Sequence, residues 1–256
     1  MRHEMSRRQF SGMAGAALAA FVFSDACGVD SAPFAGGNGR LTARPRADND
    51  PPRRLESGPL GLETGRDAIL SLPPDAAGAR PLPLLVLLHG ATGRGDAMLR
   101  RLGSAPADAG IVVLSPDSRG GTWDAIRSGF GPDVEYLARA LKRVFDALPI
   151  DPARVAIGGF SDGATYALSL GLINGDLFRK VVAFSPGFVV PGEGHGKPSF
   201  FVSHGTADRI LPIEECSRQI VPALRRRGYE VIFKEFDGPH TVPADVAQEA
   251  MHWLVS

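Results

Sequence analysis

The stretch Val155–Ala167 reads VAIGGFSDGATYA, and it decides the fold. A short apolar run leads into two glycines, and one serine, Ser161, stands between a phenylalanine and an aspartate before a third glycine. Residues 159–163 match G-x-S-x-G, in which the serine lies on a strained turn between a strand and a helix. Glycines flank such a serine because larger side chains would collide with the neighbouring strand and helix. We therefore expect a strand before Ser161, a helix after it, and a hydroxyl raised above the end of the strand.

A glycine-rich turn between a strand and a helix also occurs in nucleotide-binding folds, so a catalytic serine requires an acid and a histidine later in the chain. Both are present, each just past a predicted strand. The strand at 200–202 leads into SHGTAD, which ends at Asp208, and the strand ending at 236 leads into DGPH, which ends at His240. This order predicts Ser161 as nucleophile, Asp208 as acid and His240 as general base. Asp237 is the strongest competitor for the acid, but it lacks the HGxxD setting.

Working outward, strands and helices alternate along the rest of the chain from about Gly58. The segment Leu82–Leu88 is nearly all aliphatic, which is typical of a strand buried on both faces. Repeated alternation of this kind predicts one domain, residues 58–256, with a mostly parallel sheet and helices on both faces. The predicted strands are 67–72, 82–88, 111–114, 155–157, 181–184, 200–202 and 231–236, and the predicted helices are 96–102, 134–148, 164–173, 213–227 and 243–254.

This domain resembles the α/β-hydrolases, and it is most similar to the phospholipase/carboxylesterase, dienelactone-hydrolase-like branch. The segments LLHGATG, GGFSDGA, SHGTADRILP and GPHTVP carry the resemblance and span the whole predicted domain. The resemblance implies an eight-stranded sheet, a Ser-His-Asp triad and no large cap domain. Dienelactone hydrolases use a cysteine where this chain has Ser161, which disfavours that particular activity. The predicted chemistry uses side chains and backbone amides alone, so we expect no cofactor and no metal.

Two backbone amides are expected to form an oxyanion hole. The amide of Asp162 begins the helix after Ser161, and the helix dipole lies behind it. By resemblance, the second donor is the amide of Ala91, in the loop LHGATG after the strand 82–88. Only one glycine follows His89, so the loop is not of the HGGG type. His89 and His204 both precede a glycine at a strand end, and we interpret them as structural.

The loops between the strands of the site are short, the longest being 117–131 and 187–197, so we expect an open site without a lid. Trp123, Phe130 and Phe188 lie in these loops and are candidates for lining a substrate pocket. We expect hydrolysis of carboxylic esters with short to medium acyl groups. A thioesterase, a polyester depolymerase or a peptidase would use the same residues. A non-catalytic surface binding protein is the alternative of another class, but such a protein would normally have lost a triad residue.

Composition excludes one class of partner. The 256 residues contain 28 Lys and Arg against 28 Asp and Glu, so no overall positive field attracts nucleic acid. A small-molecule ester is the expected partner instead. Residues 28–57 are rich in Gly, Pro, Arg and Asp, show no period, and are predicted to form an extended tether.

Residues 1–27 have the pattern of a twin-arginine export signal. Arg7 and Arg8 precede the stretch 12–23, which is apolar and carries no charge. This stretch is shorter than the ~20 residues of a membrane-spanning helix. The sequence SDACG at 24–28 fits cleavage after small residues, and it also fits a lipoprotein site at which a lipidated Cys27 would attach the protein to a membrane. We therefore expect a periplasmic, extracellular or lipid-anchored protein.

Overall fold

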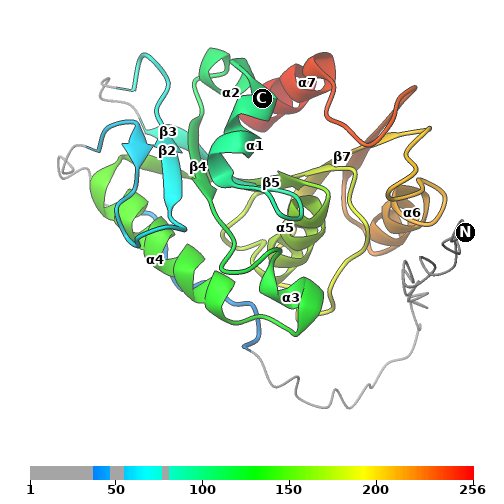
Figure 1. Ribbon diagram of the computed structural model, residues 1–256, viewed down its shortest axis with the longest axis horizontal. Coiled ribbons are helices and arrows are strands. Elements are labelled where there is room, and N and C mark those ends of the chain that lie inside the picture. Colours follow the sequence, from blue (N-terminus) through cyan, green and yellow to red (C-terminus); the bar gives the residue numbers. More distant parts are fainter. Residues whose placement is uncertain (1–36, 47–54, 77–80) are drawn as a thin grey trace, which may run out of the picture. The chain divides into compact units, whose positions relative to one another are not determined.

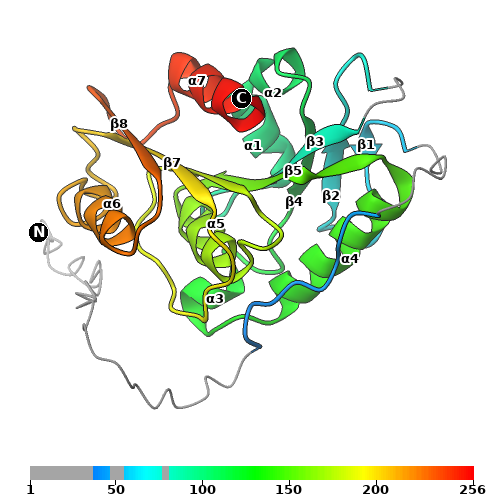
Figure 2. The same cartoon turned by 180° about the vertical axis from the view of Figure 1, so that it is seen from behind.

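The computed structural model describes residues 37–46, 55–76 and 81–256, which Figures 1 and 2 show from two sides. The predicted export signal 1–27, with Cys27, lies outside the described residues. No helix in the described ranges is long and apolar enough to cross a membrane.

Eight strands form one sheet in the order β1-β2-β4-β3-β5-β6-β7-β8. Strands β3 to β8 pair in parallel, and β2 pairs antiparallel with both β1 and β4. The mostly parallel sheet predicted from the aliphatic strands is therefore confirmed. The strands are β1 (Gly58–Pro59), β2 (Ala68–Ser71), β3 (Leu82–Leu88), β4 (Val112–Pro116), β5 (Ile150–Phe160), β6 (Lys180–Phe184), β7 (Ser199–Gly205) and β8 (Val231–Phe236).

Helices cover both faces of this sheet (Figures 1 and 2). One face carries α1 (Gly95–Leu102), α2 (Ala105–Asp108) and α7 (Ala244–Val255). The other carries α3 (Asp124–Arg127), α4 (Pro132–Ala147), α5 (Asp162–Ile173) and α6 (Ser217–Arg226).

Strand β3 shows why the central strands must be apolar on both sides. Leu84, Val86 and Leu88 pack into the core with α4 and α5, whereas Leu85 and Leu87 pack into the core with α1 and α7. All five side chains are at most 1% exposed. Successive residues of a strand point to opposite faces, so a strand between two layers of helices has no polar side.

The strand register brings the loops after five strands to one edge of the sheet. Leu88 at the end of β3 pairs with Gly159, and Phe160 at the end of β5 pairs with Phe184 at the end of β6. Gly205 at the end of β7 pairs with Phe236 at the end of β8. The loops that follow these strands therefore start from a common carboxyl edge, which is where open α/β sheets place their sites. Among the described residues, no connection inserts a cap domain at this edge.

Residues 37–46, which we call the strap, differ from the extended tether predicted for 28–57. The side chain of Leu41 is 1% exposed, and its amide donates to Asn174 Oδ1 at 2.8 Å. The Arg40 guanidinium binds both carboxylate oxygens of Asp176, at 2.8 and 3.0 Å, and Arg44 binds one of them at 2.7 Å. The pKa of Asp176 is lowered, chiefly by the hydrogen bond from Arg40. This part of the predicted tether is instead attached to the α/β domain beyond the end of α5.

The structure adds short elements that hydrophobic periodicity did not reveal. Strand β1 and helices α2 and α3 were not predicted, because two to four residues are too few to show a period. Between β6 and β7 the chain forms no helix, although these strands pair in parallel. Residues 185–198 cross along α5 instead, and the amides of Gly187 and Val190 donate to Thr165 Oγ1 and Ser169 Oγ, each at 2.9 Å.

Candidate active site

Ser161 lies between the last residue of β5 and the first residue of α5, with φ 57° and ψ −122°. A residue other than glycine rarely adopts a positive φ, and such strain clusters at functional sites. The backbone amide of Ser161 donates to Phe184 O at 2.9 Å, and its carbonyl accepts from the amides of Ala164 and Thr165 at 2.9 and 3.0 Å. The serine therefore stands on a turn that the ends of β5, β6 and α5 hold in place.

The glycines around Ser161 are required by close backbone contacts. A Cβ on Gly159 would lie 2.4 Å from Gly163 O, and a Cβ on Gly163 would lie 2.3 Å from Leu88 O. Real Cβ atoms essentially never approach other atoms this closely. The helix start thus packs directly on the end of β3, as the sequence pattern predicts.

Asp208 and His240 form a hydrogen-bonded pair. His240 Nδ1 donates to Asp208 Oδ2 at 2.6 Å, and the Asp208 side chain is fully buried while that of His240 is 14% exposed. The other oxygen, Oδ1, accepts from the backbone amides of Ile210 and Leu211, each at 2.9 Å. Burial by itself would raise the pKa of Asp208, but the hydrogen bonds from Leu211, His240 and Ile210 together lower it. The carboxylate is therefore ionised near neutral pH, and it fixes the Nδ1–H tautomer of His240.

Asp237, the competing acid, has a different position. It is exposed, and its carboxylate forms no hydrogen bond or ion pair with a described residue. The structure brings His240 to Asp208 and not to Asp237.

The Ser161 hydroxyl forms no hydrogen bond within the described chain. The ring of Phe160, the residue before Ser161, packs against the His240 ring, with centroids 4.6 Å apart. The hydrogen bond between a catalytic serine and its histidine is often long in a protein without substrate and tightens when substrate binds.

His204 contacts the candidate acid Asp208, which the sequence did not reveal. We predicted a structural histidine, but its Nε2 also lies 3.2 Å from Asp208 Oδ2, in addition to 2.8 Å from Leu211 O. Its Nδ1 lies 2.7 Å from the Ser217 hydroxyl. Burial lowers the pKa of His204, so the ring is neutral. The only signal in the sequence is the spacing of four residues in HGTAD, which places Asp208 just past the strand that carries His204.

His89 has the structural role that its place before a glycine predicts. Its Nε2 accepts from the amide of Ser118 at 2.9 Å, and its Nδ1 donates to Gly90 O at 2.7 Å. Burial lowers its pKa, which keeps the ring neutral in this arrangement. His89 thereby ties the loop after β3 to the loop after β4.

The two candidate oxyanion amides belong to segments that adjoin Ser161. Asp162 is the next residue, and the loop carrying Ala91 approaches so closely that a Cβ on Gly90 would lie 3.2 Å from Ser161 Cβ. Within the described residues, neither the Ala91 amide nor the Asp162 amide has a hydrogen-bond acceptor. Both N–H groups are therefore free to bind a ligand.

Trp123 and Phe130 do not line a pocket, contrary to the prediction. Their side chains are 1% and 5% exposed, and both contact the buried ring of Tyr166, at centroid distances of 5.2 and 5.8 Å. They are buried because the loop containing them packs its aromatic side chains against α5. Phe188 is half-buried in the segment after β6.

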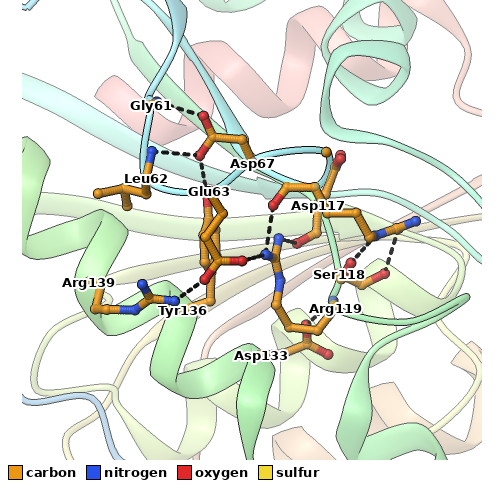
Figure 3. A network of polar contacts seen from close by, with 12 residues as sticks. Gly61, Leu62, Glu63, Asp67, Asp117, Ser118, Arg119, Asp133, Tyr136 and Arg139 are labelled. Atoms are coloured by element: carbon orange, nitrogen blue, oxygen red, sulfur yellow. Dashed lines mark hydrogen bonds and ion pairs between the residues drawn. The ribbon is translucent and has the colours of Figure 1, made fainter.

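A polar network supports this edge of the sheet beside the site (Figure 3). The Arg119 guanidinium lies 3.7 Å from the Tyr136 ring centroid and donates to Glu63 and to Asp117 O, at 2.5 and 2.7 Å. Tyr136 donates to Asp67 at 2.6 Å. The network joins the start of β2, the end of β4 and helix α4, and so fixes the end of β4, from which the loop containing Trp123 leaves.

Two acidic residues cap helices next to this network. Asp133 Oδ2 accepts from the amide of Asp124 at 2.7 Å, and Asp124 Oδ2 accepts from the amide of Asp133 at 2.8 Å. Asp133 is 2% exposed, and burial raises its pKa to about 6.

Two hollows of about 250 and 190 Å³ lie elsewhere on the domain. The larger is lined by residues at the opposite ends of β6, β7 and β8, among them Lys180, Ser199 and Val231. Neither contains Ser161 or His240. Among the described residues, no group of three or more His, Cys, Asp or Glu side chains is arranged to hold a metal.

Residues 125–255 match the family model described as phospholipase/carboxylesterase, and the chain belongs to this family. A protein of Nocardia uniformis subsp. tsuyamanensis that is named as an esterase, NocK, is 27% identical over 171 residues. The match covers 64% of this chain and 44% of that protein, so the chain spans less than half the length of this relative.

Three solved structures have the same fold. Esterase PE8 is 24% identical with a TM-score of 0.59, and the match covers 72% of this chain and 97% of that one. The fluorophosphonate-binding serine hydrolase FphF of Staphylococcus aureus is 18% identical over 75% of this chain and 92% of its own, with a TM-score of 0.62. The Bacillus cereus carboxylesterase is 21% identical over 75% and 94%, with a TM-score of 0.57. The α/β-hydrolase fold predicted from the sequence is confirmed.

Proposed function

We propose that this protein is a serine hydrolase that cleaves carboxylic esters with short to medium acyl groups. The observation that carries the proposal is the 2.6 Å hydrogen bond between His240 and Asp208 at the sheet edge where Ser161 is held at φ 57°. Membership of the phospholipase/carboxylesterase family and the esterase names of NocK and PE8 support the reaction class.

In the first half of the reaction, Ser161 Oγ attacks the ester carbonyl carbon, and its proton passes to His240 Nε2. Because Nδ1 donates to Asp208, the lone pair lies on Nε2, where a base is needed. The ionised Asp208 then stabilises the imidazolium. When the tetrahedral intermediate collapses, the bond to the alcohol oxygen breaks, and His240 gives that oxygen the proton. The acyl group stays on Ser161.

In the second half, water attacks the acyl-enzyme carbonyl while His240 Nε2 takes a proton from it. Collapse releases the acid and returns the proton to Ser161. In both halves the carbonyl oxygen becomes an oxyanion, which the free amides of Ala91 and Asp162 bind. Removing one such donor typically lowers kcat by ~10²–10³-fold.

The absence of a cap among the described residues supports an open site for small or extended acyl groups. Thioester, polyester or peptide cleavage by the same residues is the alternative. The partner we propose is a small-molecule ester, and no cofactor enters any step.

Labelling with a fluorophosphonate probe tests the proposal, because the probe phosphonylates only an activated serine. We expect the wild-type protein to be labelled and to hydrolyse p-nitrophenyl esters, and Ser161→Ala to lose labelling and ~10⁴-fold or more in kcat. Ser104→Ala, an exposed hydroxyl on another loop, is the matched control. Wild-type activity in Ser161→Ala would overturn the proposal.

We also propose export of the folded enzyme through the twin-arginine pathway, on the basis of Arg7 and Arg8. Replacing both with lysine should leave the precursor in the cytoplasm. If Cys27 is lipidated, the mature protein should partition into detergent and Cys27→Ala should release it. Export of the double-lysine variant at the wild-type level would exclude this pathway.

A further inference from the structure

Three consecutive residues, Gly121, Thr122 and Trp123, contact both segments that carry the candidate oxyanion amides. We call residues 121–123 the clamp. They follow β4 in the chain, whereas Ala91 follows β3 and Asp162 follows β5. Since β3 lies between β4 and β5 in the sheet, the clamp extends from the end of β4 past the Ala91 loop to the start of α5.

On the Ala91 side, the clamp binds the peptide groups before and after the free amide. Trp123 Nε1 donates to His89 O at 2.8 Å, and Gly121 O accepts from the amide of Thr92 at 2.6 Å. The peptide between them contains the Ala91 N–H. Thr92 is held at φ 57°, a conformation that such fixed neighbours can maintain. The two hydrogen bonds therefore fix the orientation of the peptide that carries the unpaired Ala91 amide.

On the Asp162 side, Thr122 Oγ1 donates to Asp162 Oδ2 at 2.5 Å. Asp162 is the first residue of α5, where the helix dipole favours a negative charge. An unrestrained carboxylate at this position would compete with a substrate oxyanion for that positive end. The Thr122 hydroxyl holds the carboxylate on the clamp and leaves the Asp162 amide to the substrate.

The base of the clamp is rigid. The Trp123 ring stacks on Tyr166 at 5.2 Å and contacts His89 at 4.9 Å, and Tyr166 donates to Asp124 at 2.7 Å. The burial that removes Trp123 from the substrate pocket is thus what gives the clamp a fixed position.

We propose that the clamp sets the spacing of the two oxyanion amides and that Thr122 is a positioning residue for catalysis. The inference rests on the proposed serine-hydrolase function, whose oxyanion it concerns. Misplacing a donor weakens transition-state binding and leaves substrate binding nearly intact, so the effect should fall on kcat rather than KM.

The experiment replaces Thr122 with valine, which keeps the shape and removes the hydroxyl, and with serine, which keeps the hydroxyl. With p-nitrophenyl acetate, we expect Thr122→Val to lower kcat by ~10-fold or more, with KM within about twofold. Thr122→Ser should restore most of kcat. The inhibition constant of phenylboronic acid should rise in Thr122→Val by about the factor lost in kcat. In this adduct the Ser161 oxygen bonds to boron, its proton passes to His240, and a boron-bound oxygen occupies the oxyanion position.

Ser104→Ala is the matched control. It removes an exposed hydroxyl that lies on another loop and donates to the Asp108 carboxylate at 2.8 Å. It should leave kcat and the phenylboronic acid constant unchanged. A Thr122→Val variant with wild-type kcat overturns the clamp while Ser161-dependent turnover persists. So does a variant that loses kcat but binds phenylboronic acid normally. A wild-type protein that neither turns over esters nor labels at Ser161 overturns the proposed function, and this inference with it.

Discussion

Thr92, Ser161 and Ser185 have φ of 57°, 57° and 50°, and they are the residues other than glycine with a positive φ in the described chain. Each follows a strand at the carboxyl edge, after β3, β5 and β6 respectively. Such conformations cost about 1–3 kcal/mol each and persist only where surrounding contacts impose them. At the residue scale, backbone strain is therefore concentrated around the candidate active site.

Gly163 tests how tightly the serine turn is packed. In Gly163→Ala the new methyl would lie 2.3 Å from Leu88 O, so the helix start must move away from β3. We expect a loss of about 2 kcal/mol or more in the free energy of unfolding, measured by urea denaturation, together with reduced esterase activity. Gly194→Ala is the control, because its nearest atom would be at 3.5 Å. Equal stability of the two variants would contradict the packing described.

The choice of acid can be tested by two matched substitutions. Asp208→Asn should lower kcat by orders of magnitude, since an amide would favour the wrong tautomer of His240; in serine proteases this change lowers kcat by ~10⁴-fold. Asp237→Asn should change kcat by less than about twofold, because an exposed carboxylate without partners in the described chain contributes little. The reverse result in steady-state kinetics would show that the acid is misassigned.

Asp133 predicts a specific pH dependence of stability. Burial raises its pKa from 3.8 to about 6 in the folded protein. Between these values the unfolded chain has lost the proton that the folded chain keeps, so stability falls as the pH rises. About 2 pKa units correspond to up to about 3 kcal/mol. The free energy of unfolding of wild type minus that of Asp133→Asn should decrease by this amount from pH 4 to pH 7, and a flat difference would show that the pKa is not raised.

Local chemistry made Ser161, Asp208 and His240 predictable, since each stands in a loop whose glycines and strand ends are visible in the sequence. Their roles stay predictions until activity is measured. The positions of Trp123 and Phe130 were not predictable, because an aromatic residue in a loop can face either substrate or core. Only the path of the loop 117–131 over α5 decides between them. The contact of His204 with Asp208 depends on how the chain turns back after β7, which no pattern encodes.

At the scale of elements, long amphipathic helices and aliphatic strands were predictable, and the strap was not. Residues 37–46 have the composition of a linker, yet Leu41 is buried and Arg40 binds Asp176 through two hydrogen bonds. A segment without regular structure gives no periodic signal. Its attachment depends on partners more than a hundred residues away, at Asn174 and Asp176.

Leu41→Ala distinguishes a docked strap from a tether. Removing a fully buried leucine side chain should lower the free energy of unfolding by about 2–4 kcal/mol, measured by urea denaturation. Thr42→Ala, at the exposed neighbouring position, should change it by less than about 0.5 kcal/mol. If Leu41→Ala were as stable as Thr42→Ala, the strap would contribute nothing to the fold.

At the scale of the whole molecule, the carboxyl edge carries loops but no cap among the described residues. We expect kcat/KM to be highest for p-nitrophenyl acetate and butyrate in solution. The rate should rise smoothly with substrate concentration and show no jump when a longer ester forms micelles, because no lid has to open. A strong preference for long-chain emulsions would contradict an open site.

The strap also limits how far proteases can shorten the protein from its N-terminal side. Removal of the proposed export signal near residues 26–28 would leave it intact, whereas trimming past Gly37 would begin to remove it. A chain starting at Gly58 would leave the fully buried amide of Asn174 without the partners that Gly39 and Leu41 provide, and Asp176 without either arginine. We therefore expect the smallest stable product of proteolysis to be larger than the α/β sheet and its helices, with an N-terminus set by residues that belong to no strand or helix.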